Sequence, residues 1–407
     1  NFYNVETVGK DAFKKTTFET LTIPASVQTW GSYVFAECSN LTTVVVEEGV
    51  TAIPSYMFQG CIALSSIQLA NSVTTLYDYA LAGTAALTSI DLKNVTEFGP
   101  GVFAMTQISS TKYYPGLTSV VIPEGTKYLT GIGAVSGDTT NGKIFKDAVN
   151  LTQVTLPSTL EMIGAYTFQG CTALTTIDIP ASVNFIGYQA FVDSGITSIE
   201  IKNPDITLYR AFSGAKALAT VTLPEGMTNL GYQTFENCTA FTSVVIPEGV
   251  TEIRENAFTS CLNLEKVQIP AGVTHIGEWA FAWCGKLRTI SLRDVEEIDS
   301  CAFYSCKTLE EVILPERPFL VASEAFSSCD KLADKDGFII LKGFLFDYIG
   351  KAEHITIPDG VRFIGSEALA RRDYLKTVVC PDSVTKILSR AFYCCKNVWN
   401  KSNSLWN

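Results

Sequence analysis

Histidine and charged residues are scarce in this chain of 407 residues. Histidine occurs only twice, and Asp, Glu, Lys and Arg together make up 17% of the sequence. Metal sites and acid–base catalysts need clustered histidines, cysteines or carboxylates. His275 and His354 stand alone at outward strand positions, which favours solvated side chains, and Glu296, Glu297 and Asp299 are interpreted as a solvated acidic edge. We therefore expect no catalytic residue, no metal and no cofactor.

The chain also lacks a long apolar run and an excess of basic residues. Its apolar runs are far shorter than the roughly 20 residues that cross a bilayer, so we expect no direct membrane insertion. The net charge is −11, whereas nucleic acids and anionic membranes attract clustered Lys and Arg. Neither is expected as a partner. The sequence starts at Asn1 without a basic and apolar leader, so we expect any signal peptide to lie outside this chain.

A repeated pattern of apolar residues is the main feature that is present. Hydrophobic residues make up 47% of the sequence, which is enough for a folded core. Ile246–Ile253 aligns with Ile269–Ile276, one period of 23 residues later, and the alignment continues through Phe258 and Phe281. The repeat is I-P-x-x-V-T-x-I-G-x-x-A-F-x-x-C-x-x-L-x-x-V-x. Because single globular cores stop growing at roughly 250–300 residues, a stack of repeats explains the length of the chain.

The aromatic position of the repeat recurs along nearly the whole chain and predicts about sixteen coils. Its occupants are Phe13, Phe35, Phe58, Leu81, Phe103, Phe145, Phe168, Phe191, Phe212, Phe235, Phe258, Phe281, Phe303, Phe326, Leu369 and Phe392.

The spacing within the repeat predicts the path of each coil. Val267 and Ile269 alternate with polar residues, the period of a strand with one buried face, and Pro270 ends that strand. A second short extended piece follows. Phe281 and Cys284, three residues apart, would both face inward on one helical turn. Stacking then predicts one long parallel β-sheet with short helical turns on the opposite side.

This repeat resembles the BspA-like leucine-rich repeat, over about residues 5 to 398. The resemblance implies an α/β repeat fold, a right-handed leucine-rich-repeat solenoid, with residues 1–407 as a single domain. Members of that family are typically bacterial surface or secreted proteins implicated in adhesion. The resemblance therefore implies an extracellular or cell-surface localisation and a binding function.

Three insertions break the period, near residues 104–116, 130–144 and 333–353. Loops on a rigid scaffold often carry binding residues. The first contains Tyr113 and Tyr114, which are candidate partner-binding residues because Tyr supplies contact area at low entropic cost; the alternative is a tolerated surface loop. In the third, residues 338–348 predict a β-hairpin that turns at Lys342 and Gly343 and packs its apolar side over the solenoid. The alternative there is a ligand-binding flap.

The cysteines follow the repeat and do not predict a disulfide framework. Thr106, Ala148 and Ser194 fill the same position in other coils, so this position requires a small residue but no sulfur. Whether the three cysteines outside the register, Cys301, Cys380 and Cys394, are reactive stays open. The nine that share one position are Cys38, Cys61, Cys171, Cys238, Cys261, Cys284, Cys306, Cys329 and Cys395.

Small hydroxyls dominate the outward strand positions and predict a long, shallow, nearly neutral face without an aromatic ladder. Such a face suits an extended protein or glycan better than a small molecule, which needs a concave pocket. We therefore expect a monomeric, non-enzymatic binding or adhesion scaffold. The alternative is a structural spacer rod that presents another module, and an enzyme is less favoured. The candidate partner-binding residues on this face are Thr43, Ser66, Gln68, Thr176, Thr220, Thr222, Lys266 and Gln268.

Overall fold

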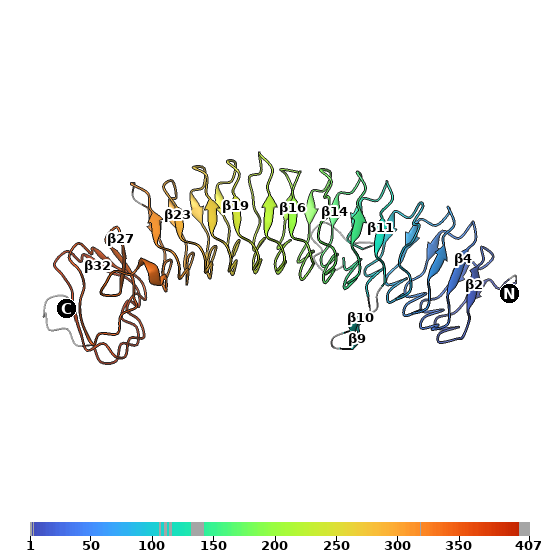
Figure 1. The fold of residues 1–407 in the computed structure, drawn as a ribbon, viewed down its shortest axis with the longest axis horizontal. Helices are drawn as coiled ribbons and strands as arrows, with labels where there is room; N and C mark the ends of the chain where they lie inside the picture. Colours follow the sequence, from blue (N-terminus) through green and yellow to red (C-terminus); the bar gives the residue numbers. More distant parts are fainter. Residues whose placement is uncertain are drawn as a thin grey trace. The chain divides into compact units, whose positions relative to one another are not determined.

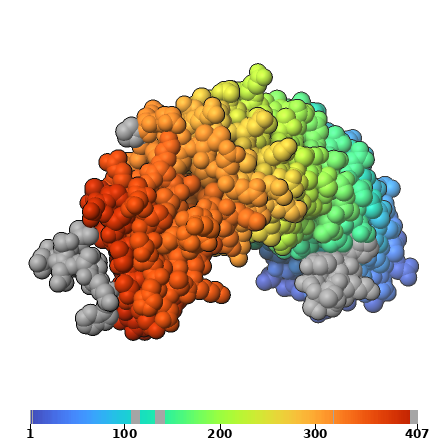
Figure 2. Space-filling view, turned by 60° about the vertical axis from the view of Figure 1, so that its left-hand side comes forward, coloured from blue at the N-terminus to red at the C-terminus, as the bar shows by residue number. Residues whose placement is uncertain are grey.

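Short coils stack in sequence order within each of two compact units (Figures 1 and 2). The computed structural model describes residues 2, 4–105, 107–109, 112–113, 116–131, 142–317 and 319–398. They divide into two compact units, Asn1–Met227 and Thr228–Asn407. The predicted leucine-rich-repeat solenoid is confirmed in both units. That all coils form a single domain stays a prediction.

Most coils contribute strands to two sides of the stack, where the sequence predicted one sheet. The strands of one side, here called a ladder, form several short sheets. In the first unit, the first ladder contains β2 (Thr20–Ile23), β4 (Thr43–Val46), β6 (Ser66–Gln68), β11 (Ser119–Val121), β13 (Gln153–Thr155), β16 (Ser198–Glu200) and β18 (Thr220–Thr222). The second ladder contains β1 (Thr7–Val8), β3 (Thr29–Trp30), β5 (Ala52–Ile53), β7 (Thr75–Leu76), β8 (Glu97–Phe98), β12 (Tyr128–Leu129), β14 (Met162–Ile163), β15 (Phe185–Ile186) and β17 (Thr207–Leu208).

The second unit repeats this arrangement. Its first ladder contains β19 (Ser243–Val245), β21 (Lys266–Gln268), β23 (Thr289–Ser291), β25 (Glu311–Ile313), β29 (His354–Thr356) and β31 (Thr377–Val379). Its second ladder contains β20 (Glu252–Ile253), β22 (His275–Ile276), β24 (Glu297–Ile298), β26 (Leu320–Val321), β27 (Phe338–Leu341), β28 (Phe344–Tyr348), β30 (Phe363–Ile364) and β32 (Lys386–Ile387).

Parallel pairing in register places like residues next to each other. Val120 of β11 pairs with Val154 of β13, and both are buried, while the flanking Val121 and Thr155 point outward. This is the period-two pattern expected from the sequence.

The repeat phenylalanines stack in the interior, as predicted. Successive rings lie parallel, with centroids 5.5 Å apart for Phe235 and Phe258 and 5.2 Å apart for Phe258 and Phe281. Phe103 stacks on Phe145 in the same way, at 5.5 Å, although the first two insertions lie between them in the sequence. Both insertions therefore leave the core stack unbroken.

The segment around each phenylalanine is a turn, so the prediction of a helical turn is wrong. The residues two before and two after the aromatic position, here called the turn positions, have positive φ: Asn256 (54°) and Ser260 (59°) flank Phe258. A right-handed helix needs negative φ at every residue. The turn instead bonds to the next coil, since the Phe258 N–H donates to the Ala280 carbonyl at 2.8 Å. The one helix among the described residues is the short 3-10 helix η1 (Asp330–Leu332).

The third insertion forms the predicted hairpin, β27 and β28, but its position differs from the prediction. Lys342 and Gly343 both have positive φ, as a two-residue type I′ turn requires. β28 pairs in parallel with β30, so the hairpin enters the second ladder and does not lie over the coils. It does so because Leu345 and Phe346 are buried there, with the Phe346 ring against Phe326 at 5.1 Å.

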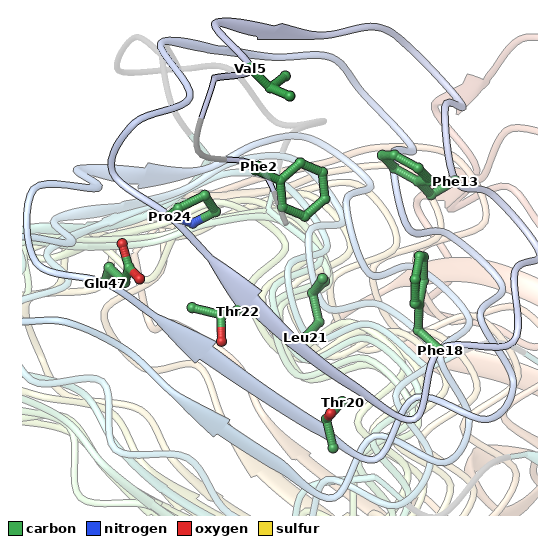
Figure 3. A pocket seen from close by; sticks show the side chains of 9 residues that line it. All are labelled: Phe2, Val5, Phe13, Phe18, Thr20, Leu21, Thr22, Pro24 and Glu47. Atoms are coloured by element: carbon green, nitrogen blue, oxygen red, sulfur yellow. The ribbon is translucent and has the colours of Figure 1, made fainter.

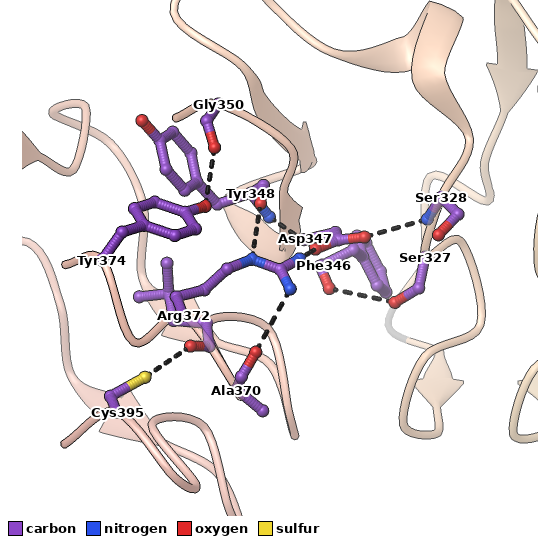
Figure 4. Close-up of polar contacts among 11 residues, drawn as sticks. Ser327, Ser328, Phe346, Asp347, Tyr348, Gly350, Ala370, Arg372, Tyr374 and Cys395 are labelled. Carbon is purple, nitrogen blue, oxygen red and sulfur yellow. Dashed lines mark hydrogen bonds and ion pairs between the residues drawn. The ribbon is translucent and has the colours of Figure 1, made fainter. Parts of the chain in front are cut away.

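A buried ion pair fixes the hairpin between the coils before and after it (Figure 4). Asp347 is 5% exposed, and one of its oxygens lies 2.9 Å from Nη2 of Arg372. The other accepts the backbone N–H of Ser328 at 2.9 Å. Arg372 also donates to the carbonyls of Tyr348 and Ala370. Losing Arg372 would leave the buried Asp347 carboxylate without its counter-charge, which is strongly destabilising.

The shared cysteine position forms a column of thiol hydrogen bonds. Each thiol donates to the carbonyl of the aromatic position one coil earlier: Cys171 to Phe145 at 3.1 Å and Cys284 to Phe258 at 3.3 Å. All twelve cysteines, each a described residue, are free thiols. Ser194 occupies the same position, 4% exposed, but its hydroxyl has no hydrogen-bond partner among the described residues. Thr106 lies outside the described residues.

The turn geometry predicts the effect of substitutions at Ser305, a turn position with φ of 58°. Gly60, Gly83, Gly170 and Gly214 occupy the same position in other coils. We expect Ser305→Val to lower the free energy of unfolding by about 1–2 kcal/mol, because a β-branched residue resists positive φ. Ser305→Gly should change it by less than about 1 kcal/mol. Urea denaturation of both variants measures this; a helical turn would make Gly the more harmful change.

The unpaired hydroxyl predicts that Ser194→Cys stabilises the protein. The longer thiol side chain can donate to the Phe168 carbonyl, as its counterparts do in other coils, and an unsatisfied buried hydroxyl costs about 1–3 kcal/mol. We expect the free energy of unfolding to rise by about 1 kcal/mol, measured by urea denaturation. Ser194→Ala, which removes the hydroxyl without adding a donor, should gain less. A loss of stability in Ser194→Cys would show that the position has no room for sulfur.

Candidate binding surfaces

The predicted strand face consists of the outward residues of the first ladder. Thr43 and Ser66 are paired neighbours and half-buried, and Gln68 lies beside Val45. Thr220 and Thr222 face Ser198 and Glu200 across the β16–β18 pair. Lys266 and Gln268 face Ser243 and Val245. Thr176 is exposed but lies outside the strands. Six of these eight candidates belong to the first unit, and Lys266 and Gln268 belong to the second.

Exposed valines accompany the hydroxyls on the strand face. Val121 and Val245 are each 63% exposed, and Val45 and Val379 are exposed as well. Each occupies the last outward position of its strand. Val45 lies beside Gln68, and Val245 lies beside Gln268. The strand face is therefore a mixed apolar and polar surface, and hydroxyls alone do not define it.

The tyrosines of the first insertion are only partly placed. Residues 107–109 and 112–113 form an antiparallel hairpin, β9 (Gln107–Ser109) and β10 (Lys112–Tyr113), which projects from the coils of its unit in Figure 1. Tyr114 and the side chain of Tyr113 lie outside the described part of the chain, as do residues 132–141 of the second insertion. Their binding role stays a prediction.

The turn positions carry aromatic stacks that the sequence analysis missed. Tyr33 and Tyr56 stack at 4.3 Å, Tyr56 and Tyr79 at 5.2 Å, and Lys14 lies 5.3 Å from the centre of the Tyr33 ring. The signal was available, because each tyrosine precedes the aromatic position by two residues. The prediction of a face without an aromatic ladder concerned the strand positions only.

A second aromatic group lies on the turn of one coil in the second unit. Trp279 and Trp283 stack at 5.1 Å with 9° between their planes. Tyr304 of the next coil meets both rings edge-on, at 5.5 and 5.6 Å. Trp283 is 39% exposed. These three residues are here called the indole platform. The segment Trp-Ala-Phe-Ala-Trp at residues 279–283 was the sequence signal for its two tryptophans.

The two histidines differ, and the expectation of solvation is wrong for one of them. His275 is half-buried between carboxylates of neighbouring coils, with Nε2 2.9 Å from Asp299 and Nδ1 3.3 Å from Glu252. His354 is exposed and lies within hydrogen-bond distance of the Thr377 hydroxyl. Glu296 of the acidic edge pairs with Arg317 at 2.9 Å. The acidic edge is thus partly neutralised by Arg317 of the next coil.

Two of the three cysteines outside the register are poor nucleophiles. Burial raises the pKa of Cys301 to about 12 and also raises the pKa of Cys380, so both stay protonated thiols at neutral pH. Cys394 is exposed. In the part of the chain that the structure describes, no group of three or more His, Cys, Asp or Glu side chains is placed to hold a metal ion. The same residues contain no helix that is long and apolar enough to cross a membrane.

A hollow of about 710 Å³ lies at the N-terminal end of the first unit (Figure 3). Phe2, Phe13, Phe18 and Leu21 line its apolar side. Beside it lies β2, an edge strand of the β2–β4–β6 sheet.

Glu324 is a turn-position carboxylate in an unfavourable environment. Burial raises its pKa above the ordinary value of 4.5, and the nearby Glu367 and Asp347 raise it further, while Arg371 opposes them. A carboxyl group with a raised pKa in the folded state costs stability when it is ionised.

The raised pKa predicts that Glu324→Gln stabilises the protein at pH 7. The folded state then binds the proton more tightly than the unfolded state, so the cost of Glu324 disappears as the pH falls through the folded pKa and then below 4.5. The stability gain of the variant should shrink over the same range, measured by urea denaturation at pH 7 and pH 4. Glu310→Gln at an exposed glutamate is the control. An equal gain at both pH values would contradict the electrostatic cause.

Comparison with known proteins supports the fold. Among solved structures, a leucine-rich repeat protein from Bacteroides ovatus ATCC 8483 is 24% identical, with a TM-score of 0.69, over 95% of this chain and 88% of that protein. A leucine-rich cell surface protein from Faecalibacterium prausnitzii A2-165 is 23% identical over 99% of this chain and 85% of that protein, with a TM-score of 0.37. No curated protein sequence matches the chain.

The family comparison confirms the resemblance seen in the sequence. The chain matches the family described as "BspA type Leucine rich repeat region (6 copies)" over residues 6–124, 138–210, 207–333 and 339–402. These segments contain every coil with a repeat phenylalanine. The chain therefore belongs to the BspA-type leucine-rich repeat family.

Proposed function

We propose that this chain is a non-enzymatic binding scaffold that acts at a cell surface or after secretion and recognises a protein or glycan partner through its strand face. The observation that carries the proposal is the exposure of apolar side chains at outward strand positions. Val121 and Val245 are 63% exposed at outward strand positions. Exposed apolar residues in a row with polar ones are typical of a contact surface.

The scaffold supports recognition because its backbone fixes the spacing of these side chains. Neighbouring strands of a ladder lie about 4.8 Å apart, so each outward row presents its groups at regular intervals. An extended partner can then contact several coils at once. This arrangement suits a broad, shallow interface better than capture of a small molecule.

The charges favour contact recognition over long-range attraction. Many are paired between neighbouring coils, such as Lys127 with Glu161 at 2.8 Å and Lys216 with Asp193 at 2.8 Å. Pairing of this kind lowers the local field at these positions, so we expect contacts made there to depend little on salt.

The proposal is tested by placing cations on the strand face. We expect the double variant Gln68→Arg and Thr222→Arg to fold normally, because both side chains are exposed, and to lose at least about tenfold in affinity for partners captured from host-matrix and bacterial-surface extracts. Affinity is measured by surface plasmon resonance against each captured partner. Ala25→Arg, an exposed corner residue of the same unit, is the matched control.

Two results would count against this function. Failure of every extract to give a saturable partner would favour the spacer role. Equal affinity in the double variant and the control would place recognition on a surface other than the strand face.

A further inference from the structure

The indole platform stands out because the backbone at these positions disfavours tryptophan. Trp279 and Trp283 occupy both turn positions of one coil, with φ of 58° and 59°. Bulky side chains resist this conformation. The position of Trp283 holds Gly, Ser, Asn or Asp in most other coils, whereas the position of Trp279 also holds Tyr in several coils. Trp283 is also 39% exposed. Neither backbone preference nor burial explains two tryptophans at this turn.

The platform is held in a fixed geometry before any ligand arrives. The Trp279 Nε1–H donates to the Glu278 carboxylate at 3.1 Å, and the Trp283 ring lies against the Trp279 ring. Tyr304 abuts the edge of the pair from the next coil. Because the rings support one another, a ligand would bind without ordering them first.

Polar groups border the platform along the stack of coils. Ser260 and Ser305 occupy the turn position of Trp283 in the coils before and after it. Backbone hydrogen bonds keep these coils in register, from the Ser260 N–H to the Ala282 carbonyl and from the Trp283 N–H to the Tyr304 carbonyl, each at 2.8 Å. A flat apolar surface is thus flanked by hydroxyls on both sides, with the Glu278 carboxylate beside it.

We propose that the indole platform is a binding site for a neutral pyranose glycan. A sugar ring has an apolar face of C–H groups, which matches the negative face of an indole ring, and a rim of hydroxyls, which matches Ser260, Ser305 and Glu278. An acidic sugar would be repelled by Glu278 and by a chain with a net charge of −11. The site is separate from the strand face, so the two can be tested independently.

Affinity electrophoresis of the full chain in gels that contain β-glucan, xylan or mannan tests this site, with polygalacturonic acid as the acidic comparison. We expect at least one neutral polysaccharide to retard the wild type. Trp283→Ala should weaken that binding at least about tenfold, whereas Trp283→Phe, which keeps a flat ring, should lose less. Polygalacturonic acid should not retard it.

Tyr232→Ala is the matched control. Tyr232 is 46% exposed in the same unit, but the Arg254 guanidinium lies 4.7 Å from the centre of its ring, so its loss should leave retardation unchanged. Melting temperatures check that each variant folds. If Trp283→Ala does not fold, Glu278→Gln provides a second test of the site.

Several outcomes would overturn the glycan site. They are retardation by no neutral polysaccharide, retardation by the acidic polymer alone, and unchanged retardation of Trp283→Ala. If a captured partner still binds the strand face in any of these cases, the proposed function stands and only the glycan site falls. If the platform binds glycan but no captured partner needs the strand face, the glycan site stands and the proposed function of the strand face falls.

Discussion

The structure depends on one hydrogen-bond register between successive coils. Backbone N–H and C=O groups of neighbouring coils pair along both ladders and also through the turns, where the Phe258 N–H meets the Ala280 carbonyl. Buried backbone groups must find such partners, and within each unit many of these partners lie in the equivalent part of a neighbouring coil. Every side chain is therefore aligned with its counterparts in a column, and each column imposes one requirement on the sequence.

The inward columns explain which residues repeat and which can vary. The aromatic column favours a ring that can stack about 5 Å from the next, close to the spacing of paired strands, although Leu81 and Leu369 also occupy it. The neighbouring column requires a small side chain, and a thiol there can donate weakly to the carbonyl of the aromatic position one coil earlier. Insertions are tolerated where they leave these columns intact, as the stacking of Phe103 on Phe145 demonstrates.

The sequence predicted the inward columns because each repeats the same residue type at a fixed period. It predicted the turn wrongly because Phe281 and Cys284, three residues apart, fit either one turn of helix or a turn with positive φ. The glycines at positions 60, 83, 170 and 214 were the signal against a helix. The place of β28 in the second ladder could not be predicted, since pairing with β30 depends on which strand edge the third insertion meets.

The division into inward and outward columns also separates the residues that stabilise the fold from those that are available for recognition. A thiol that donates to a buried carbonyl, such as Cys284 to Phe258, is held inside and protonated, because burial raises its pKa. Its nucleophilic chemistry is thereby suppressed. The outward columns have no such packing requirement, so their residues can change from coil to coil without loss of the fold. Valines on the strand face and tryptophans on one turn are changes of that kind, and the proposed binding function would give a reason to keep them there.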